Sequence, residues 1–182
     1  YMSHYALHTP IMADKRFIKK YTDAGLAPIE AKYASLIEGM DKSLGDIMNY
    51  LQEKKIDKNT IIIFLSDNGG LSAHTREGVS LNTHNTPLRS GKGSAYEGGV
   101  RIPFIVKWPG ITPANTISTN NISIEDIFPT VLALTGNKSK HEVQKLDGQS
   151  LVPLLKQQKV KNNSFYYWHY PHVWGPEGPA LQ

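Results

Sequence analysis

The sequence contains no cysteine among its 182 residues. This absence excludes disulfide bonds, thiolate zinc sites and a cysteine nucleophile within the chain. No segment approaches the run of about 20 apolar residues that a membrane-spanning helix needs, so we expect no membrane span. The formal net charge is only +4, and the basic residues form no tract. Nucleic acid is therefore not an expected partner.

The chain also lacks the basic and then apolar segment of an N-terminal secretory signal. It begins instead within a pattern typical of a strand, which we interpret as the interior of a longer protein. With 40% hydrophobic and 20% charged residues, it has the composition of an ordinary globular domain. A length of 182 residues is sufficient for one domain with a hydrophobic core.

A short apolar run at residues 61–65 is followed directly by Ser-Asp-Asn-Gly-Gly at residues 66–70. Such a run is typical of a strand buried on both faces, and open α/β sheets bind ligands beyond the carboxyl ends of their strands. Asp67 and Asn68 offer a carboxylate and an amide oxygen, which suit calcium or magnesium. The alternative is an Asx turn that only leaves the strand. The buried strand and the two glycines favour the metal site.

The same strand resembles the second metal-binding motif of phosphate-loop ATPases. That interpretation requires a GxxxxGK[ST] loop ahead of the strand. The only Gly-Lys pair is Gly91-Lys92, which follows the strand and is itself followed by Gly93. We therefore set the ATPase interpretation aside.

Strands and helices alternate along the chain, which predicts an α/β fold. Helices are indicated by apolar residues at steps of three and four, and strands by short β-branched runs. The expected elements are a strand over residues 1–7, a helix over 30–55 that follows Pro28, strands over 60–66 and 102–108, a helix from the Ser123 cap to Gly136 with a kink at Pro129, and a short helix within 146–155.

Residues 67–100 form a glycine-rich segment in which Lys92 lies between Gly91 and Gly93. Glycines allow the backbone to approach a bound anion closely, with the lysine ammonium directed at it. A solvated loop lysine is the alternative. For Glu97 and Arg101 we favour a structural role.

Histidine is the other residue type that could carry chemistry. His8 lies at the end of the first expected strand, just before Thr-Pro, and is either a surface histidine or a functional one. A second group lies near the end of the chain, at His169 and His172. With no HExxH motif and no cysteine, a zinc site within this chain has little support.

Together these segments resemble the sulfatase family, within the alkaline-phosphatase-like superfamily of hydrolases. The resemblance rests on His-Thr-Pro at 8–10, Glu-Gly-Met-Asp at 38–41, Ser-Asp-Asn-Gly-Gly at 66–70, the segments at 88–103, 108–110, 126–130 and 146–148, and Trp-His-Tyr-Pro-His at 168–172. It implies an alkaline-phosphatase-like sandwich with a central, mostly parallel sheet flanked by helices. Residues 1–160 would be the C-terminal portion of the catalytic domain, and 161–182 the start of the segment leading to the C-terminal subdomain.

The resemblance also implies roles for individual residues. In this family a calcium ion holds the sulfate group and a formylglycine in one site. Asp67 and Asn68 match two calcium ligands, and His8 and Lys92 match the pair that binds sulfate and helps to protonate the leaving alcohol. The expected substrate-binding residues are His74, Arg76, His84, His169 and His172.

The family's nucleophile motif is absent: Cys or Ser, any residue, Pro or Ala, any residue, then Arg. Residues 72–76 imitate its spacing, but His74 stands at the middle position and the segment follows the metal loop. The aspartate pair that completes the family's calcium site is also missing. The chain thus resembles one half of an active site, so we expect it to be inactive and to bind calcium weakly without the N-terminal part of the catalytic domain.

The expected activity of the whole protein is sulfuric ester hydrolysis, on a sulfated carbohydrate or an aryl sulfate. The closing Trp-His-Tyr-Pro-His looks like the bacterial sulfatases that degrade polysaccharides. The resemblance further implies a periplasmic or extracellular location. Two alternatives stay open, a phosphoesterase or phosphonate hydrolase of the same superfamily, and a non-catalytic binder of sulfated glycans.

Overall fold

The computed structural model describes four ranges of the chain, and their residues fall into two compact units. The ranges are residues 1–71, 85–136, 144–160 and 166–167. The first unit contains the described residues up to 105, and the second contains those from 106 to 167. None of the helices in these ranges combines the length and the apolar character that crossing a bilayer requires.

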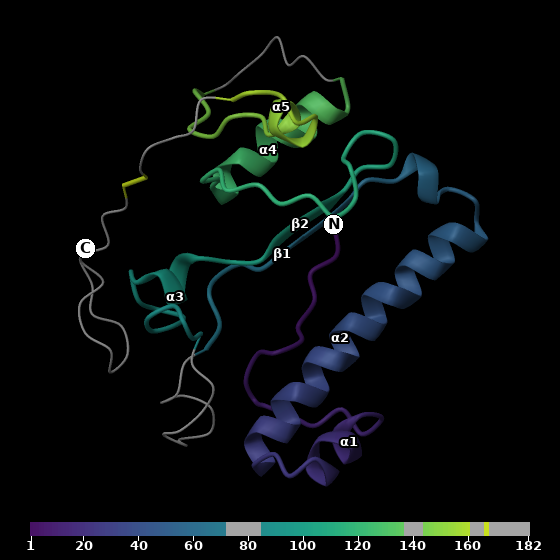
Figure 1. Ribbon diagram of the computed structural model, residues 1–182, viewed down its shortest axis with the longest axis vertical. Helices are drawn as coiled ribbons and strands as arrows, with labels where there is room; N and C mark the ends of the chain where they lie inside the picture. Colours follow the sequence, from purple (N-terminus) through teal and green to yellow (C-terminus); the bar gives the residue numbers. More distant parts are fainter. Residues whose placement is uncertain (72–84, 137–143, 161–165, 168–182) are drawn as a thin grey trace. The chain divides into compact units, whose positions relative to one another are not determined.

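The predicted long helix is α2, Pro28–Glu53, with Pro28 in its first turn (Figure 1). Proline is favoured there because its missing N–H would have no partner inside the helix. The buried residues of α2 are Ile29, Ala31, Ser35 and Gly39. Ala31, Ser35 and Gly39 recur at steps of four, so they lie on one face of the helix. This is not the face that the apolar pattern predicts: none of the apolar residues from Tyr33 to Leu51 that form the pattern is fully buried, and Ile37 and Met48 are exposed.

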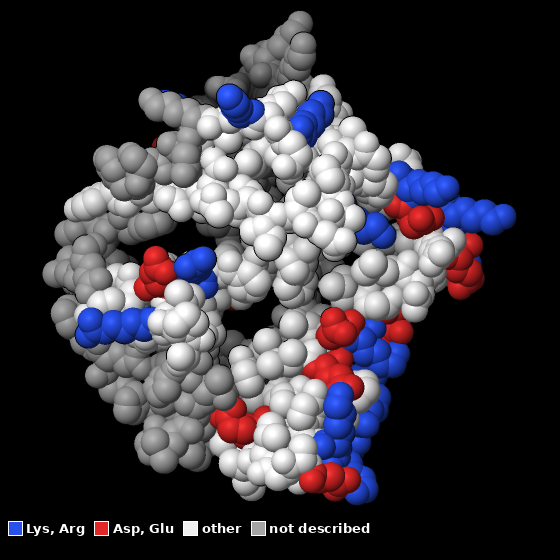
Figure 2. All heavy atoms as spheres, viewed as in Figure 1, with Lys and Arg blue, Asp and Glu red and all other residues white. Residues whose placement is uncertain are grey.

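The short helix α1, Ile18–Asp23, packs against α2 and was not predicted. It buries none of its own residues, and with six residues it is too short to show a full apolar period. An ion pair joins the two helices, with Lys20 Nζ 3.1 Å from Glu38 Oε2. Figure 2 shows basic and acidic side chains intermixed on the face along these helices. The charges there are therefore largely paired.

Strand β1, Ile62–Leu65, follows the 3₁₀ turn η1, Asp57–Asn59, and pairs with β2, Phe104–Lys107. Both strands fall inside the predicted ranges. They run antiparallel, so the described residues do not form the mostly parallel sheet that was expected. Parallel neighbours need a long crossover connection, usually a helix. The described chain between β1 and β2 holds only the four-residue α3, Glu97–Val100.

The strand predicted over residues 1–7 is wrong: these residues form no strand in the structure. A strand requires a neighbour with which to exchange backbone hydrogen bonds, and residues 1–7 have no such neighbour among the described residues. Leu7 also has a φ of 72°, which interrupts the extended path. The segment ends in a turn, where His8 N donates to Tyr5 O over 3.4 Å.

In the second unit, Ser123 and Asp126 form a capping box around the 3₁₀ turn η3, Ile124–Asp126. Helix α4, Ile127–Leu134, follows and ends just before Gly136, whose φ is +67°. The predicted cap and end are therefore confirmed. Pro129 lies in the first turn of α4, where a proline is compatible with the helix, and not at a mid-helix kink as expected.

The buried side chains of Asp126 and Thr130 hold the segment that precedes α5, Val152–Leu155, onto α4. Asp126 Oδ1 accepts a hydrogen bond from Gln149 N (2.8 Å), and Thr130 Oγ1 accepts one from Leu151 N (2.8 Å). Buried polar groups are tolerated when they are paired in this way. This pairing makes the second unit a small body of its own.

Candidate functional site

The predicted metal ligands lie where β1 ends. Ser66 Oγ donates to Asn68 O (2.9 Å), and the Asn68 side-chain nitrogen donates to Gly69 O (2.9 Å). Within residues 1–71, 85–136, 144–160 and 166–167, no donor reaches Asn68 Oδ1, and Asp67 is exposed. Asp67 Oδ1 accepts a long hydrogen bond from Ser66 Oγ (3.4 Å), which leaves Asp67 Oδ2 and the Asn68 amide oxygen available. Both are oxygen ligands of the kind that calcium takes.

These two ligands fit only part of a calcium site. Calcium takes six to eight oxygen ligands, and a tight site needs several carboxylates. Among the described residues, no three His, Cys, Asp or Glu side chains are grouped closely enough to hold a metal ion. The remaining ligands would have to come from elsewhere, as the sequence predicts.

Glycines allow the turn after β1 to pack directly on α3. Gly69 N donates to Gly99 O (2.8 Å), and a Cβ atom on Gly69 would collide with the carbonyl oxygen of Gly98. Gly98 N in turn donates to Arg89 O (2.9 Å). A side chain at position 69 or 98 would force these backbones apart. We call residues 66–70 and 85–100 together the strand-exit frame.

The frame brings Lys92 next to the metal ligands. Its backbone N donates to Gly70 O (2.9 Å), so Lys92 is held by the same segment that carries Asp67 and Asn68. Lys92 is half-buried, and Gly93 follows it with a φ of +93°. This positive φ explains why glycine is needed at position 93. The structure thus joins two parts of the predicted site.

His8 and Lys92 lie close together, with 3.5 Å between His8 Nε2 and Lys92 Nζ. His8 Nδ1 lies 2.9 Å from Thr9 O, which can only accept, so this contact is a hydrogen bond in the tautomer that carries its proton on Nδ1. In that tautomer the lone pair of Nε2 faces the lysine ammonium. At 3.5 Å the contact is long for a hydrogen bond, and the two groups can both turn to a third atom between them.

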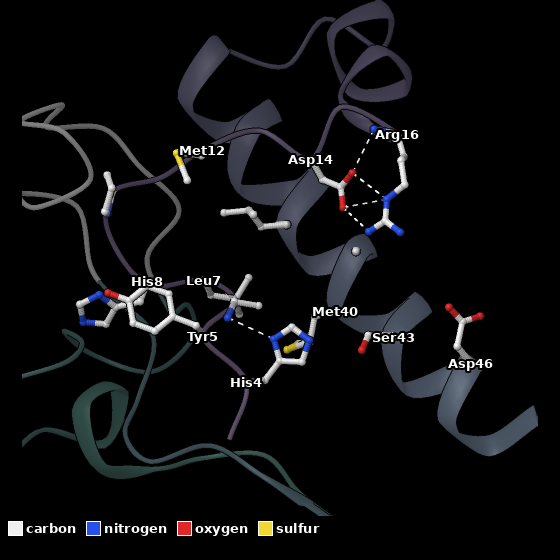
Figure 3. Close-up of a pocket in the computed structure, with 14 residues that line it drawn as sticks. His4, Tyr5, Leu7, His8, Met12, Asp14, Arg16, Met40, Ser43 and Asp46 are labelled. Atoms are coloured by element: carbon white, nitrogen blue, oxygen red, sulfur yellow. Dashed lines mark hydrogen bonds and ion pairs between the residues drawn. The ribbon is translucent and has the colours of Figure 1, made fainter. Parts of the chain in front are cut away.

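A pocket of about 490 Å³ lies beside His8, between the first 16 residues and α2 (Figure 3). On one side of it, Arg16 Nη2 lies 2.6 Å from Asp14 Oδ2 and a second bond joins Arg16 Nε to Asp14 Oδ1 (3.0 Å). These hydrogen bonds from Arg16 lower the pKa of Asp14 from 3.8 to about 2. The Asp14 carboxylate rests on Gly39, where a side chain would collide with it. Sequence reasoning missed this ion pair, which has no motif.

Glu97 and Arg101, for which a structural role was favoured, form an ion pair across one turn of α3 (3.2 Å). Arg89 lies 3.9 Å above the ring of Tyr96. Arg89 and Tyr96 both belong to the frame, whereas Arg101 lies just beyond its end. The five predicted substrate-binding residues lie outside the described residues: His74, Arg76, His84, His169 and His172.

Comparisons with known proteins identify the family of the chain. The Sulfatase family profile matches residues 1–137. A sulfatase of Formosa agariphila is 35% identical over 188 residues, which cover 94% of this chain and 32% of that protein. N-acetylgalactosamine-6-sulfatase of Mus musculus is 36% identical over 164 residues, which cover 89% of this chain and 29% of that protein.

Solved structures give the same result. The structure of Ps i-CgsB in complex with k-i-k-neocarrahexaose has a TM-score of 0.72 and 33% identity, over 83% of this chain and 32% of that one. The chain therefore spans about a third of the length of the relatives that it matches. With the profile match over most of its residues, the chain belongs to the sulfatase family.

Proposed function

We propose that this chain is part of a calcium-dependent sulfuric ester hydrolase whose formylglycine nucleophile is supplied by an N-terminal part of the same protein. The observation that carries the proposal is the cluster at the end of β1. There Lys92 Nζ lies 3.5 Å from His8 Nε2, and the Lys92 backbone is bonded to the segment that holds Asp67 and Asn68.

Asp67 and Asn68 would hold the calcium ion through their side-chain oxygens. When bound, calcium supplies a Lewis acid and a template for the sulfate group. The Ser66 and Asn68 hydrogen bonds keep the turn in place, so the two oxygens need little reordering to bind the ion. This preorganisation favours binding because less conformational entropy is lost.

Lys92 and His8 would act on the substrate itself. A sulfate ester carries a diffuse negative charge, and an ammonium group directed at its oxygens stabilises the charge that grows as the ester bond breaks. Protonated His8, or Lys92, would donate a proton to the departing alcohol oxygen. Hydrolysis of the ester anion then consumes one water and gives an alcohol, a sulfate ion and a proton.

The proposed substrate is a sulfated carbohydrate or an aryl sulfate. The names of the relatives support this class, since one is an N-acetylgalactosamine-6-sulfatase and one solved structure contains k-i-k-neocarrahexaose. From the resemblance to the sulfatase family we also propose a periplasmic or extracellular location. The five residues proposed to contact the substrate remain His74, Arg76, His84, His169 and His172.

The N-terminal part of the protein would also complete the fold. We propose that further strands join β1 and β2 in an alkaline-phosphatase-like sandwich with a mostly parallel central sheet. Residues 1–160 would then be the C-terminal portion of the catalytic domain, and residues 161–182 would lead into the C-terminal subdomain. Without the missing part, the 182-residue chain should show no turnover and only weak calcium binding.

The test is hydrolysis by the full-length protein of 4-nitrophenyl sulfate and 4-nitrophenyl phosphate, each with and without a calcium chelator. We expect sulfate cleavage that is lost on chelation and restored by calcium. Preferential cleavage of the phosphate, restored by zinc or manganese, would contradict the proposal and indicate a phosphoesterase or phosphonate hydrolase. Binding of a sulfated oligosaccharide with no cleavage, and with neither Cys nor Ser in the upstream motif, would indicate a non-catalytic binder.

A further inference from the structure

Two of the segments that form the proposed site are residues 66–70, with the metal ligands, and residues 85–92, with Lys92. The side chain of Asn85 joins them. Asn85 Nδ2 donates to Gly70 O (2.9 Å) and also to Ser90 O (3.0 Å). Gly70 closes the segment that carries the metal ligands, and Ser90 precedes Lys92 by two residues. Both amide hydrogens of Asn85 are therefore used to hold one segment against the other.

The carbonyl oxygen of Gly70 is the point where the two segments meet. It accepts one hydrogen bond from Asn85 Nδ2 and another from Lys92 N, each at 2.9 Å. A carbonyl oxygen has two lone pairs, so both are used at this junction. Any movement of Asn85 away from Gly70 would leave Lys92 N as the only donor on this oxygen among the described residues.

The second contact of Asn85, with Ser90 O, restrains a residue whose backbone conformation is unusual. Its φ of 64° lies in the left-handed region, which non-glycine residues adopt only when their surroundings hold them there. The hydrogen bond from Asn85 to Ser90 O is one such restraint. The direction in which the chain leaves Ser90 sets where the Lys92 side chain begins.

Glycine at position 70 makes room for this arrangement. A Cβ atom on Gly70 would collide with the Asn85 amide, and no closer neighbour of that position is described. Position 70 must therefore be glycine if the Asn85 amide is to pack there. Neither residue belongs to the pair proposed to bind calcium or to the pair proposed to protonate the leaving group.

We propose that Asn85 is a positioning residue that fixes the Lys92 ammonium relative to the metal ligands Asp67 and Asn68. It acts through the carbonyl groups of Gly70 and Ser90 and does not contact the substrate. The inference rests on the proposed function, because it assigns Lys92 a part in protonating the leaving oxygen.

The test compares Asn85→Asp and Asn85→Ala in the full-length protein, loaded with calcium, on aryl sulfates whose leaving phenols have increasing pKa. The aspartate keeps the size of the side chain and removes both donors. On the substrates with the poorest leaving groups, we expect kcat to fall by about 100-fold, which is the effect of misplacing a catalytic group by about 1 Å. On the substrates with the best leaving groups, kcat should fall much less. KM should change little, because the sulfate contacts remain.

Asn49→Asp is the matched control, since Asn49 is an exposed asparagine on α2 with no side-chain hydrogen bond among the described residues. It should keep the activity of the unaltered protein on every substrate. An equal loss of kcat by the Asn85 variants over the whole leaving-group series would overturn the inference, because a purely structural role does not depend on the leaving group. Asn85→Ala adds no charge, and it carries the test if Asn85→Asp does not fold.

A second measurement does not require activity. Acetylation of surface lysines, read by mass spectrometry, gives the ratio of Lys92 labelling to Lys107 labelling in the same sample. Displacement of Lys92 should shift this ratio in both Asn85 variants and not in Asn49→Asp. An unchanged ratio contradicts the role of Asn85 even if the protein cleaves sulfate. If the ratio shifts in a protein that cleaves no sulfate ester, the result supports the role of Asn85 in positioning Lys92 and rejects the proposed function.

Discussion

The strand-exit frame and the first ten residues of the chain carry the two halves of the proposed catalytic pair, and they are built in opposite ways. In the frame, backbone hydrogen bonds join Gly69 to Gly99 and Lys92 to Gly70. Five of its residues are buried: Gly69, Gly91, Ser94, Gly98 and Gly99. Residues 1–5 are all exposed. The one described backbone bond within residues 1–10 joins His8 to Tyr5.

This difference indicates which part of the site is encoded locally. Lys92 and the metal ligands are fixed by contacts between segments that this chain contains. His8 is fixed by its contacts with Thr9 O and Lys92 and by a ring contact with Tyr5, whose centroid lies 5.5 Å away. We therefore expect the frame to keep its geometry when other contacts change, and the position of His8 to depend more on its surroundings.

The largest effect is expected for Lys92→Ala, because it removes the charge that the frame holds in place. In the full-length protein, kcat on an aryl sulfate should fall by about 1,000-fold, within the range for loss of a positioned acid or charge. Lys107→Ala removes a lysine at the exposed end of β2 and is the control. Comparable losses for both variants would contradict a specific role for Lys92.

A second prediction tests the rigidity of the frame. Gly98→Ala should lower the free energy of unfolding by about 3 kcal/mol, because its Cβ atom would meet the carbonyl oxygens of Arg89 and Ser90. Gly45→Ala is the control: nothing lies within 4 Å of that Cβ, and α2 should gain about 0.5–1 kcal/mol. Urea unfolding measures both. Equal shifts would mean that the frame yields easily.

The other half of the pair is tested by His8→Ala, for which we expect a loss of about 100-fold in kcat. His4→Ala is the matched control, an exposed histidine from the same ten residues whose Nδ1 accepts a hydrogen bond from Ala6 N (3.2 Å). Its effect on kcat should be small. If both substitutions cost the same, the first ten residues would matter as a whole and not through His8.

The smallest effect concerns Asp14 and acid. Its pKa is lowered from 3.8 to about 2 in the folded chain by the hydrogen bonds from Arg16. Because the folded-state pKa is the lower one, ionised Asp14 stabilises the folded chain above about pH 4, and this contribution is lost as the pH falls towards 2. Asp14→Asn should flatten the stability profile between these pH values, as measured by urea unfolding. Asp41→Asn, on the exposed side of α2, controls for the loss of one charge; an identical profile for both variants would argue against the Asp14–Arg16 pair.

Several regular elements could be predicted because each depends on local chemistry. The helical period of α2, the apolar run of β1 and the Ser123 cap can each be recognised from residues that are close together in the sequence. The Asp67-Asn68 pair and Lys92 could be found because glycines flank them. The structure places His8 beside Lys92 and bonds the Lys92 backbone to the segment that carries Asp67 and Asn68, whose role as metal ligands stays a prediction.

The rest depends on contacts that no single segment contains. Residues 1–7 show the alternation of a strand, but they have no partner strand in the described chain. Helix α3 includes two glycines, so its residues have low helix propensity. It forms because Gly98 and Gly99 are buried within the frame. Asn85 carries no motif, and its importance follows only from the two carbonyl groups that it reaches.

The hydrogen bonds of Asp126 with Gln149 and of Thr130 with Leu151 have a consequence for engineering. Asp126 and Thr130 accept hydrogen bonds from the backbone of Gln149 and Leu151. The segment before Gly136 and the segment after Leu146 are therefore held together by contacts other than the peptide that connects them. A cut in that connection would leave a nicked pair that stays associated. The same connection is accordingly a suitable point to open the chain for circular permutation or to insert a reporter domain.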